Sequence, residues 1–261
     1  MDKHIASVSF GKDSLAMLLR LVEERRPLDE VVFYDTGMEF QAIYDTRDQV
    51  LPLLAQRGVK YTELHPEYDF CWQMFERPVD GPNGPHLGYS WCGGRCRWGT
   101  TDKLVALDRY AEQQGAMVYI GIAADEMARL TKERKNYKLF PLVEWGMAEN
   151  KCLTYCYDHG FDWVEDGGAG EVRLYYVLDR VSCWCCTNKN LKELRNIYHL
   201  LPLYWDKLKD LQLRTSRPMK GEAKSVFDLE RRFQLEDERL AAGLSITNRD
   251  FYRQLADRLA K

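Results

Sequence analysis

The sequence predicts an α/β protein with a doubly wound, mostly parallel sheet and helices on both of its faces. In the first half of the chain, short apolar runs alternate with stretches whose apolar residues recur at helical spacing. The first apolar run leads through a Gly- and Ser-containing turn directly into a helical pattern. Because strands that alternate with helices of this length form parallel β-α-β units, these observations favour a doubly wound sheet.

The N-terminal elements follow one another in a regular order. The first predicted strand covers residues 5–10, and the helix after it ends before Pro27. A second strand at residues 31–34, a helix at about residues 40–57 and a third strand at residues 59–64 repeat the pattern.

The second half of the chain changes character. A helix is predicted at residues 101–114 and a core strand at residues 117–122. From Thr187 onward only helical patterns remain. We therefore expect an α/β domain at residues 1–186 and a helical C-terminal extension at residues 187–261.

Composition and charge indicate an ordinary globular protein and give no sign of a secreted or membrane-spanning one. The chain is 45% hydrophobic and 30% charged, as in ordinary globular proteins. It opens without the apolar run of a signal peptide and lacks the roughly 18 consecutive apolar residues of a membrane span, so we expect a cytoplasmic protein with no membrane partner. The formal charge of −3 gives no general attraction to nucleic acid. Residues 129–138 and 214–224 are locally basic, which suits either polynucleotide contacts or solvated helix faces.

The first strand-to-helix turn reads Ser9-Phe10-Gly11-Lys12-Asp13-Ser14. Backbone N–H groups at a helix N-terminus are unpaired and lie at the positive end of the helix dipole, so this turn predicts an anion site. Lys12 adds a positive charge, and Asp13 either orients the loop or helps to hold Mg²⁺. The pattern is neither a Walker A loop nor a dinucleotide-binding G-x-G-x-x-G. The simpler alternative is an ordinary Ser-capped helix.

Together with residues 34–40 (Tyr-Asp-Thr-Gly-Met-Glu-Phe), this loop resembles the phosphoadenosine-phosphosulfate (PAPS) reductase family. That family belongs to the adenine-nucleotide α-hydrolase-like superfamily, alongside the N-type ATP pyrophosphatases with their PP-loop. The resemblance covers about residues 4–190 and implies a parallel five-stranded sheet. It also implies nucleotide contacts from the loop, from the Asp35-Thr36-Gly37 turn near the adenosine, and from Gly121 and Arg129 on the far side.

Five of the eight cysteines form two clusters: Cys92 with Cys96, and Cys183 with Cys185 and Cys186. Clustered cysteines in a reducing compartment are metal ligands or redox groups more often than disulfides. Four thiolates suit a structural zinc ion or a [4Fe–4S] cluster.

The resemblance favours iron–sulfur, with Cys92, Cys96, Cys183 and Cys186 as ligands, because adenylyl-sulfate reductases carry two cysteine pairs in similar positions. Two features depart from that pattern: three residues separate the first pair, and Cys185 is an additional thiol, either a substitute ligand or a free nucleophile.

Three functions remain open. The first is ATP-dependent sulfur transfer, in which ATP with Mg²⁺ adenylates a substrate such as tRNA or DNA and a sulfur donor displaces AMP. Lys12, Asp13 and Cys185 are the expected catalytic residues. The second is reduction of adenylyl sulfate (APS) or PAPS with thioredoxin, although the Glu-Cys-Gly segment that carries the family's nucleophile has no counterpart, since Cys186 is the last cysteine. The third is a non-catalytic accessory subunit of a mobile-element or defence system.

Overall fold

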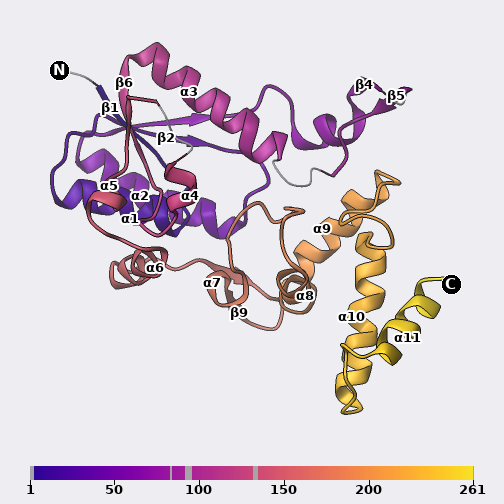
Figure 1. Cartoon of the computed structure of the whole chain (residues 1–261). Coiled ribbons are helices and arrows are strands. Elements are labelled where there is room, and N and C mark those ends of the chain that lie inside the picture. The colour runs from indigo at the N-terminus through magenta and orange to yellow at the C-terminus, as the bar shows by residue number, and fades with distance from the viewer. Residues whose placement is uncertain (1–2, 83, 92–95, 132–134, 261) are drawn as a thin grey trace.

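Five parallel strands form the central sheet in the order β3-β2-β1-β6-β7 (Figure 1). The computed structural model describes residues 3–82, 84–91, 96–131 and 135–260. The strands are β1 (Lys3–Ser7), β2 (Glu30–Tyr34), β3 (Lys60–Leu64), β6 (Ala116–Ile120) and β7 (Lys138–Leu139). The predicted α/β class and the five-stranded parallel sheet are confirmed.

Helices cover both faces of this sheet, as predicted (Figure 1). On one face lie α1 (Lys12–Glu23), α2 (Gln41–Gln56), α5 (Pro141–Glu144) and α6 (Glu149–Asp158). The other face is covered by α3 (Lys103–Gln114). The main hydrophobic core lies on the α1 side, and a smaller cluster around Ile5, Val32 and Ala116 lies beneath α3.

Short elements connect the main ones. Two antiparallel hairpins and four short helices make up this set: β4 (Pro78–Gly81) with β5 (Gly84–Leu87), β8 (Val164–Asp166) with β9 (Glu171–Arg173), the π-helical turns η1 (Trp72–Glu76) and η2 (Arg97–Asp102), α4 (Met127–Leu130) and α7 (Leu174–Val177). The η2 turn runs directly into α3, so the segment after the first cysteine cluster is fixed to the sheet-covering helix.

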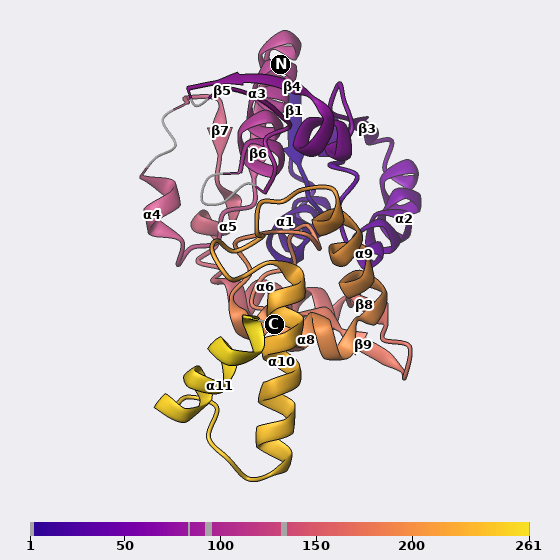
Figure 2. The ribbon, with the colours of Figure 1, turned by 90° about the vertical axis from the view of Figure 1, so that its right-hand side faces the viewer.

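Only helices follow residue 187 in the described chain, as the sequence predicts. They are α8 (Leu191–Leu200), α9 (Pro202–Leu213), α10 (Val226–Ala241) and α11 (Arg249–Leu259). The first two and the start of α10 pack into the main core, whereas α10 and α11 extend away from the sheet (Figure 2). The domain boundary at residues 186 and 187 stays a prediction. No described helix is long and apolar enough to cross a membrane.

The order of the strands places a switch point between β1 and β6. The chain first builds the sheet on one side of β1, through β2 and β3, and then on the other side, through β6 and β7. The loops after β1 and β6 therefore leave the sheet in opposite directions and open a crevice at its carboxyl edge, where doubly wound proteins bind ligands.

A buried carboxylate ties three of these strands together at the opposite edge. Glu30 is fully buried at the start of β2, and its carboxylate pairs with Lys3 at 2.6 Å and Lys60 at 2.9 Å. The hydroxyl groups of Thr62 and Tyr110 donate to the same carboxylate. Burial raises the pKa of Glu30, but these hydrogen bonds outweigh it and lower the pKa to about 2.

We expect Glu30→Gln to lower the free energy of unfolding at pH 7 by about 1–3 kcal/mol, the range for hydrogen bonds to a charged group. A carboxyl with a lowered pKa stabilises the fold above its unfolded pKa, and this contribution disappears as the pH falls through the folded value. Wild-type stability should therefore fall between pH 4.5 and about 2 more steeply than that of the variant. Urea unfolding across this range measures both; parallel curves would contradict the assignment.

Candidate functional site

The loop between β1 and α1 closes on itself through two serines. The Ser9 backbone N–H donates to Ser14 Oγ at 3.1 Å, and the two hydroxyl oxygens also lie 3.1 Å apart. Phe10 adopts a left-handed conformation, with φ of 56°, which turns the chain sharply into the helix. Gly11 is the last residue before α1, so the first N–H groups of the helix face the carboxyl edge of the sheet.

Residues from distant parts of the chain hold this loop in place. The indole Nε1 of Trp163 donates to the Phe10 carbonyl oxygen at 2.8 Å, and the Lys12 backbone N–H donates to Tyr175 Oη at 2.9 Å. A Cβ atom on Gly121, just after β6, would lie 2.7 Å from Ser14 Cα. The end of β6 and the start of α1 therefore approach so closely that only glycine fits there.

The Lys12 ammonium lies between two carboxylates. Its Nζ is 3.0 Å from Asp13 and 2.6 Å from Glu149, at the start of α6, and only 8% of the residue is exposed. Burial lowers the pKa of Lys12, but the two carboxylates outweigh burial and raise it. Burial also raises the pKa of Asp13, and the negative charges of Glu149 and Glu126 raise it further. Lys12 lowers the pKa of Asp13 but does not outweigh them. The lysine is charged and held at the base of the loop.

A cavity of about 480 Å³ opens above this loop. The cavity is lined by the loop residues Ser9, Gly11, Lys12, Asp13 and Ser14 and by Gly121. Arg129 also lines it, and its Nη1 lies 2.7 Å from both carboxylate oxygens of Glu126. Its charged lining consists of four basic and five acidic side chains: Lys12, Lys103, Arg129 and Arg180, with Asp13, Glu39, Glu126, Glu149 and Asp179.

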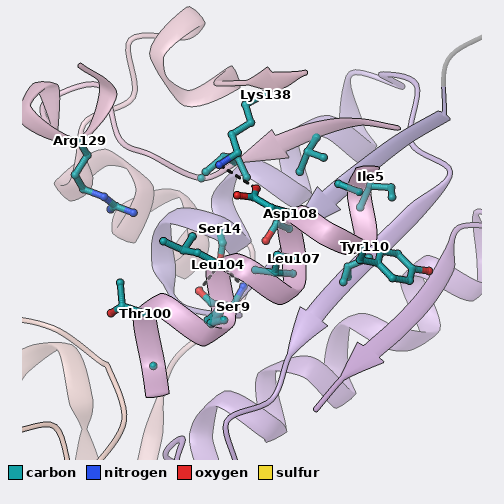
Figure 3. Close-up of a pocket in the computed structure, with 18 residues that line it drawn as sticks. Ile5, Ser9, Ser14, Thr100, Leu104, Leu107, Asp108, Tyr110, Arg129 and Lys138 are labelled. Atoms are coloured by element: carbon teal, nitrogen blue, oxygen red, sulfur yellow. Dashed lines mark hydrogen bonds and ion pairs between the residues drawn. The ribbon is translucent and has the colours of Figure 1, made fainter. Parts of the chain in front are cut away.

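A second chamber of about 730 Å³ continues from this cavity beneath α3 (Figure 3). Ser9, Ser14, Thr100, Gly121 and Arg129 line both spaces, so the two form one continuous cleft. The inner part of the chamber is largely apolar, with side chains from the sheet and from α3: Ile5, Val32, Leu104, Leu107, Val118 and Ile120. The cleft thus has a charged end at the loop and, under α3, a chamber in which these apolar side chains stand beside the Asp108–Lys138 ion pair (3.2 Å) and Tyr110.

The second cysteine cluster reaches the charged end of the cleft. Cys183 lines the cavity, and its Sγ lies 3.6 Å from Thr36 Oγ1 and 3.8 Å from Glu39 Oε1. The Trp184 backbone N–H donates to the Met38 carbonyl oxygen at 3.0 Å. The predicted Asp35-Thr36-Gly37 turn therefore contacts the cysteine segment, and none of its three residues lines the cleft. Its contact with an adenosine stays a prediction.

Cys96, the described member of the first cysteine cluster, lies near the second cluster. The Gly99 backbone N–H faces Cys96 Sγ at 3.4 Å, and a Cβ atom on Gly99 would lie 3.8 Å from Cys183 Sγ. A tight turn, with the Cys186 N–H donating to the Cys183 carbonyl oxygen at 3.0 Å, brings Cys186 back toward the same region. Cys92 lies outside the described residues.

A buried lysine accompanies these thiols. Lys189 is 2% exposed, and its Nζ lies 3.3 Å from both the Arg180 carbonyl oxygen and Ser182 Oγ. Burial lowers its pKa, while the nearby thiols of Cys183 and Cys186 act in the opposite direction. Burial raises the pKa of the Cys183 thiol well above its usual value.

Two predicted site residues face the core instead of the cleft. The Phe10 side chain is fully buried and packs edge-on against Phe33, so only its backbone is available to a ligand. Cys185 is 5% exposed within the main core, and burial raises the pKa of its thiol. Cys183 is the member of its cluster that lines the cleft. A nucleophilic role for Cys185 stays a prediction, and this burial counts against it.

Among the described residues, the trio of potential ligands whose atoms all lie within 4.8 Å of one another is Asp35, Glu63 and His65. The described cysteines alone do not form such a trio. Glu63 already accepts hydrogen bonds from Arg47 and Tyr61, so this trio is largely satisfied without an ion.

Three functional contacts were not predicted from the sequence: those of Glu149, Trp163 and Tyr175 with the loop. Each lies more than 130 residues from its loop partner. No spacing rule connects a lone tyrosine or tryptophan to a loop so far away, so the sequence carries no signal for them.

Comparisons with known proteins agree with this architecture. The family model described as the phosphoadenosine phosphosulfate reductase domain matches residues 3–189. Two uncharacterized proteins of Methanocaldococcus jannaschii, MJ0066 and MJ0973, are each 25% identical to this chain over 78% of its length. The chain spans 40% and 46% of their lengths.

Among solved structures, the U34-tRNA thiolase NcsA from Methanococcus maripaludis with its [4Fe-4S] cluster aligns with a TM-score of 0.41 and 16% identity. That alignment covers 91% of this chain and 72% of the other.

We expect Tyr175→Phe to lower the free energy of unfolding by about 1 kcal/mol, since it removes the partner of the Lys12 backbone N–H. The matched control is Tyr176→Phe. The Tyr176 hydroxyl accepts a hydrogen bond from the exposed Arg173, so this change should alter stability by less than about 0.5 kcal/mol. Urea unfolding of the two variants provides the comparison. Equal stabilities would show that the Tyr175 hydroxyl does not hold the loop.

Proposed function

This chain belongs to the phosphoadenosine phosphosulfate reductase domain family, and from that premise we propose that it is an adenine-nucleotide-dependent enzyme of sulfur transfer. One observation carries the proposal: the anion loop and the Cys183 thiol line the same cavity. A nucleotide held by the loop would lie beside a sulfur atom. Adenylation of a substrate and its attack by sulfur require these two groups close together.

The two ends of the cleft match the two ends of an adenine nucleotide. The phosphates would lie at the N-terminus of α1, where the positive end of the helix dipole, Lys12 and the Ser9 and Ser14 hydroxyls favour an anion. The adenosine would occupy the apolar chamber beneath α3. The five carboxylates in the charged cavity oppose a bare triphosphate, which supports binding as the Mg²⁺ complex with Asp13 near the ion.

The proposed reaction has two steps. A substrate oxygen attacks the α-phosphorus of ATP, the bond to the β-phosphate oxygen breaks, and pyrophosphate leaves. A reduced sulfur donor then attacks the adenylated carbon, and AMP departs with the original oxygen. Lys12 and the loop N–H groups would stabilise the charge that develops on the leaving pyrophosphate. Glu39, 3.8 Å from Cys183, is placed to accept a proton from that thiol.

The thiols around Cys183 also suit a metal centre. Soft thiolate ligands select iron–sulfur clusters or zinc. We propose that Cys96, Cys183 and Cys186 hold a [4Fe–4S] cluster together with Cys92, with zinc as the alternative occupant. The buried Lys189 would offset the negative charge of such a thiolate centre. When bound, a cluster would supply redox chemistry beside the nucleotide.

Reduction of a sulfonucleotide is the second candidate, favoured by the family itself and by the position of Cys183 in the cleft. There a thiolate would attack the sulfur of APS or PAPS, AMP or its 3′-phosphate would leave, and thioredoxin would release sulfite. The two candidates differ in product. Sulfite from APS or PAPS would establish the reductase, whereas pyrophosphate from ATP without sulfite would establish sulfur transfer.

We expect Lys12→Ala to weaken ATP binding about tenfold or more, because a charge-assisted contact to phosphate contributes about 1.5–3 kcal/mol. The matched control is Lys151→Ala, an exposed lysine on α6 outside the cleft, which should retain wild-type affinity. Isothermal titration with ATP and Mg²⁺ measures both. Unchanged affinity in Lys12→Ala would count against the loop as the phosphate site.

We expect protein purified without oxygen to show the broad visible absorption of a thiolate-bound iron–sulfur cluster. Cys183→Ser should lose this absorption together with bound iron. Cys71→Ser should retain both, because Cys71 lies half-buried against the core, outside the two clusters. Absorption spectra and metal analysis provide the readout. A colourless protein with stoichiometric zinc would overturn the choice of metal.

A further inference from the structure

Aromatic rings and arginine side chains alternate along one surface of the molecule. Tyr68 and Trp72 stack with ring centroids 4.3 Å apart. The Arg77 guanidinium lies 6.0 Å from the Trp72 ring centroid and 5.3 Å from that of Tyr89. The Arg97 guanidinium lies 4.6 Å from the same Tyr89 centroid. We call these five residues the aromatic–arginine ladder. It extends from the segment before η1, past the β4–β5 hairpin, to the start of η2.

The guanidinium groups of the ladder have no acidic partner in the part of the chain that the structure describes. Among the described residues, no carboxylate lies within ion-pair distance of Arg77 or Arg97, and Arg77 donates to the neutral Gln73 side chain at 3.1 Å. Tyr68 is 44% exposed and Arg97 is exposed. Guanidinium groups stacked on rings and open to solvent are suited to contact both the faces of bases and phosphate groups.

A basic segment from the far end of the chain lies beside the ladder. Residues 214–224, which are locally basic, form the loop between α9 and α10 (Figure 1). Arg214 pairs with Glu76 at 3.0 Å, and the Thr215 and Ser90 hydroxyl oxygens lie 3.0 Å apart. Folding therefore brings the basic loop against the segment that carries the ladder.

This surface also adjoins the cleft. Arg97 is the first residue of η2, and Gly99 and Thr100 in the same turn line the charged cavity. On the other side, Lys220 of the basic loop donates to the Thr187 and Lys189 carbonyl oxygens, directly after the second cysteine cluster. A chain lying along the ladder would therefore end at the place where nucleotide and thiol are expected to meet.

We propose that the ladder and the basic loop bind an unpaired loop of RNA and present one of its bases to the cleft as the sulfur acceptor. Unstacked bases in RNA loops are recognised by stacking on aromatic rings and arginine planes, while basic side chains follow the phosphates. A regular duplex hides its base faces and could not use the ladder. The binding surface stands on its own geometry, and only the role as acceptor rests on the proposed function.

The test is an RNA titration without ATP, using a fluorescent hairpin with an unpaired loop. A combined Tyr68→Ala and Arg97→Gln variant removes both exposed ends of the ladder. We expect its affinity to fall about tenfold or more, the effect of losing at least one stacked base. The control is Tyr252→Ala with Arg253→Gln on α11, which makes the same chemical changes at exposed positions. It should bind the hairpin like the wild type.

Thermal unfolding checks that both variants are folded. Equal affinity of the ladder variant and the control, tighter binding of a fully paired duplex, or tighter binding of the DNA version of the hairpin would each overturn the proposal. Titration of ATP without RNA tests the proposed function separately. ATP binding without RNA binding would contradict the ladder proposal alone. RNA binding without ATP binding would contradict only the proposed nucleotide chemistry.

Discussion

The structure depends on holding one strained turn against the edge of its sheet. Phe10 takes a left-handed conformation that costs a non-glycine residue of the order of 1–3 kcal/mol, and it persists because the surroundings fix it. Its side chain is anchored in the core, and its carbonyl oxygen accepts a hydrogen bond from Trp163. With the turn in place, the N-terminus of α1 lies at the switch point of the sheet. The cleft, its charges and its neighbouring thiols are all arranged around that point.

Local patterns were sufficient to predict much of this fold. The first three strands, the helices between them, the turn from β1 into α1 and the helical C-terminal region follow from periodicity and turn residues that lie close together in sequence. The contacts that complete the site are long-range. Tyr175 and Glu149 meet the loop only because α6 and α7 pack beside α1, and which cysteine faces the cleft depends on the turn at residues 183–186. Neither could be read from spacing.

The Lys12 ammonium already has acidic partners in the cleft before any ligand binds. Lys12 is already paired with Asp13 and Glu149, so an incoming anion must exchange with a carboxylate or arrive with its own cation. Burial raises the pKa of the Cys183 thiol, so this group too differs from a free cysteine side chain. Under the proposed function, a bound nucleotide would change the surroundings of both groups, since they line the same cavity.

The central claim is that this loop binds the phosphate end of an adenine nucleotide. Isothermal titration of the wild-type protein with ATP and Mg²⁺, and separately with adenosine, tests it most directly. Under the proposed function adenosine would occupy the chamber under α3 without engaging the loop, so we predict that it binds at least about a hundredfold more weakly, a difference of about 2.7 kcal/mol. Equal affinities, or no binding of ATP, would contradict the account.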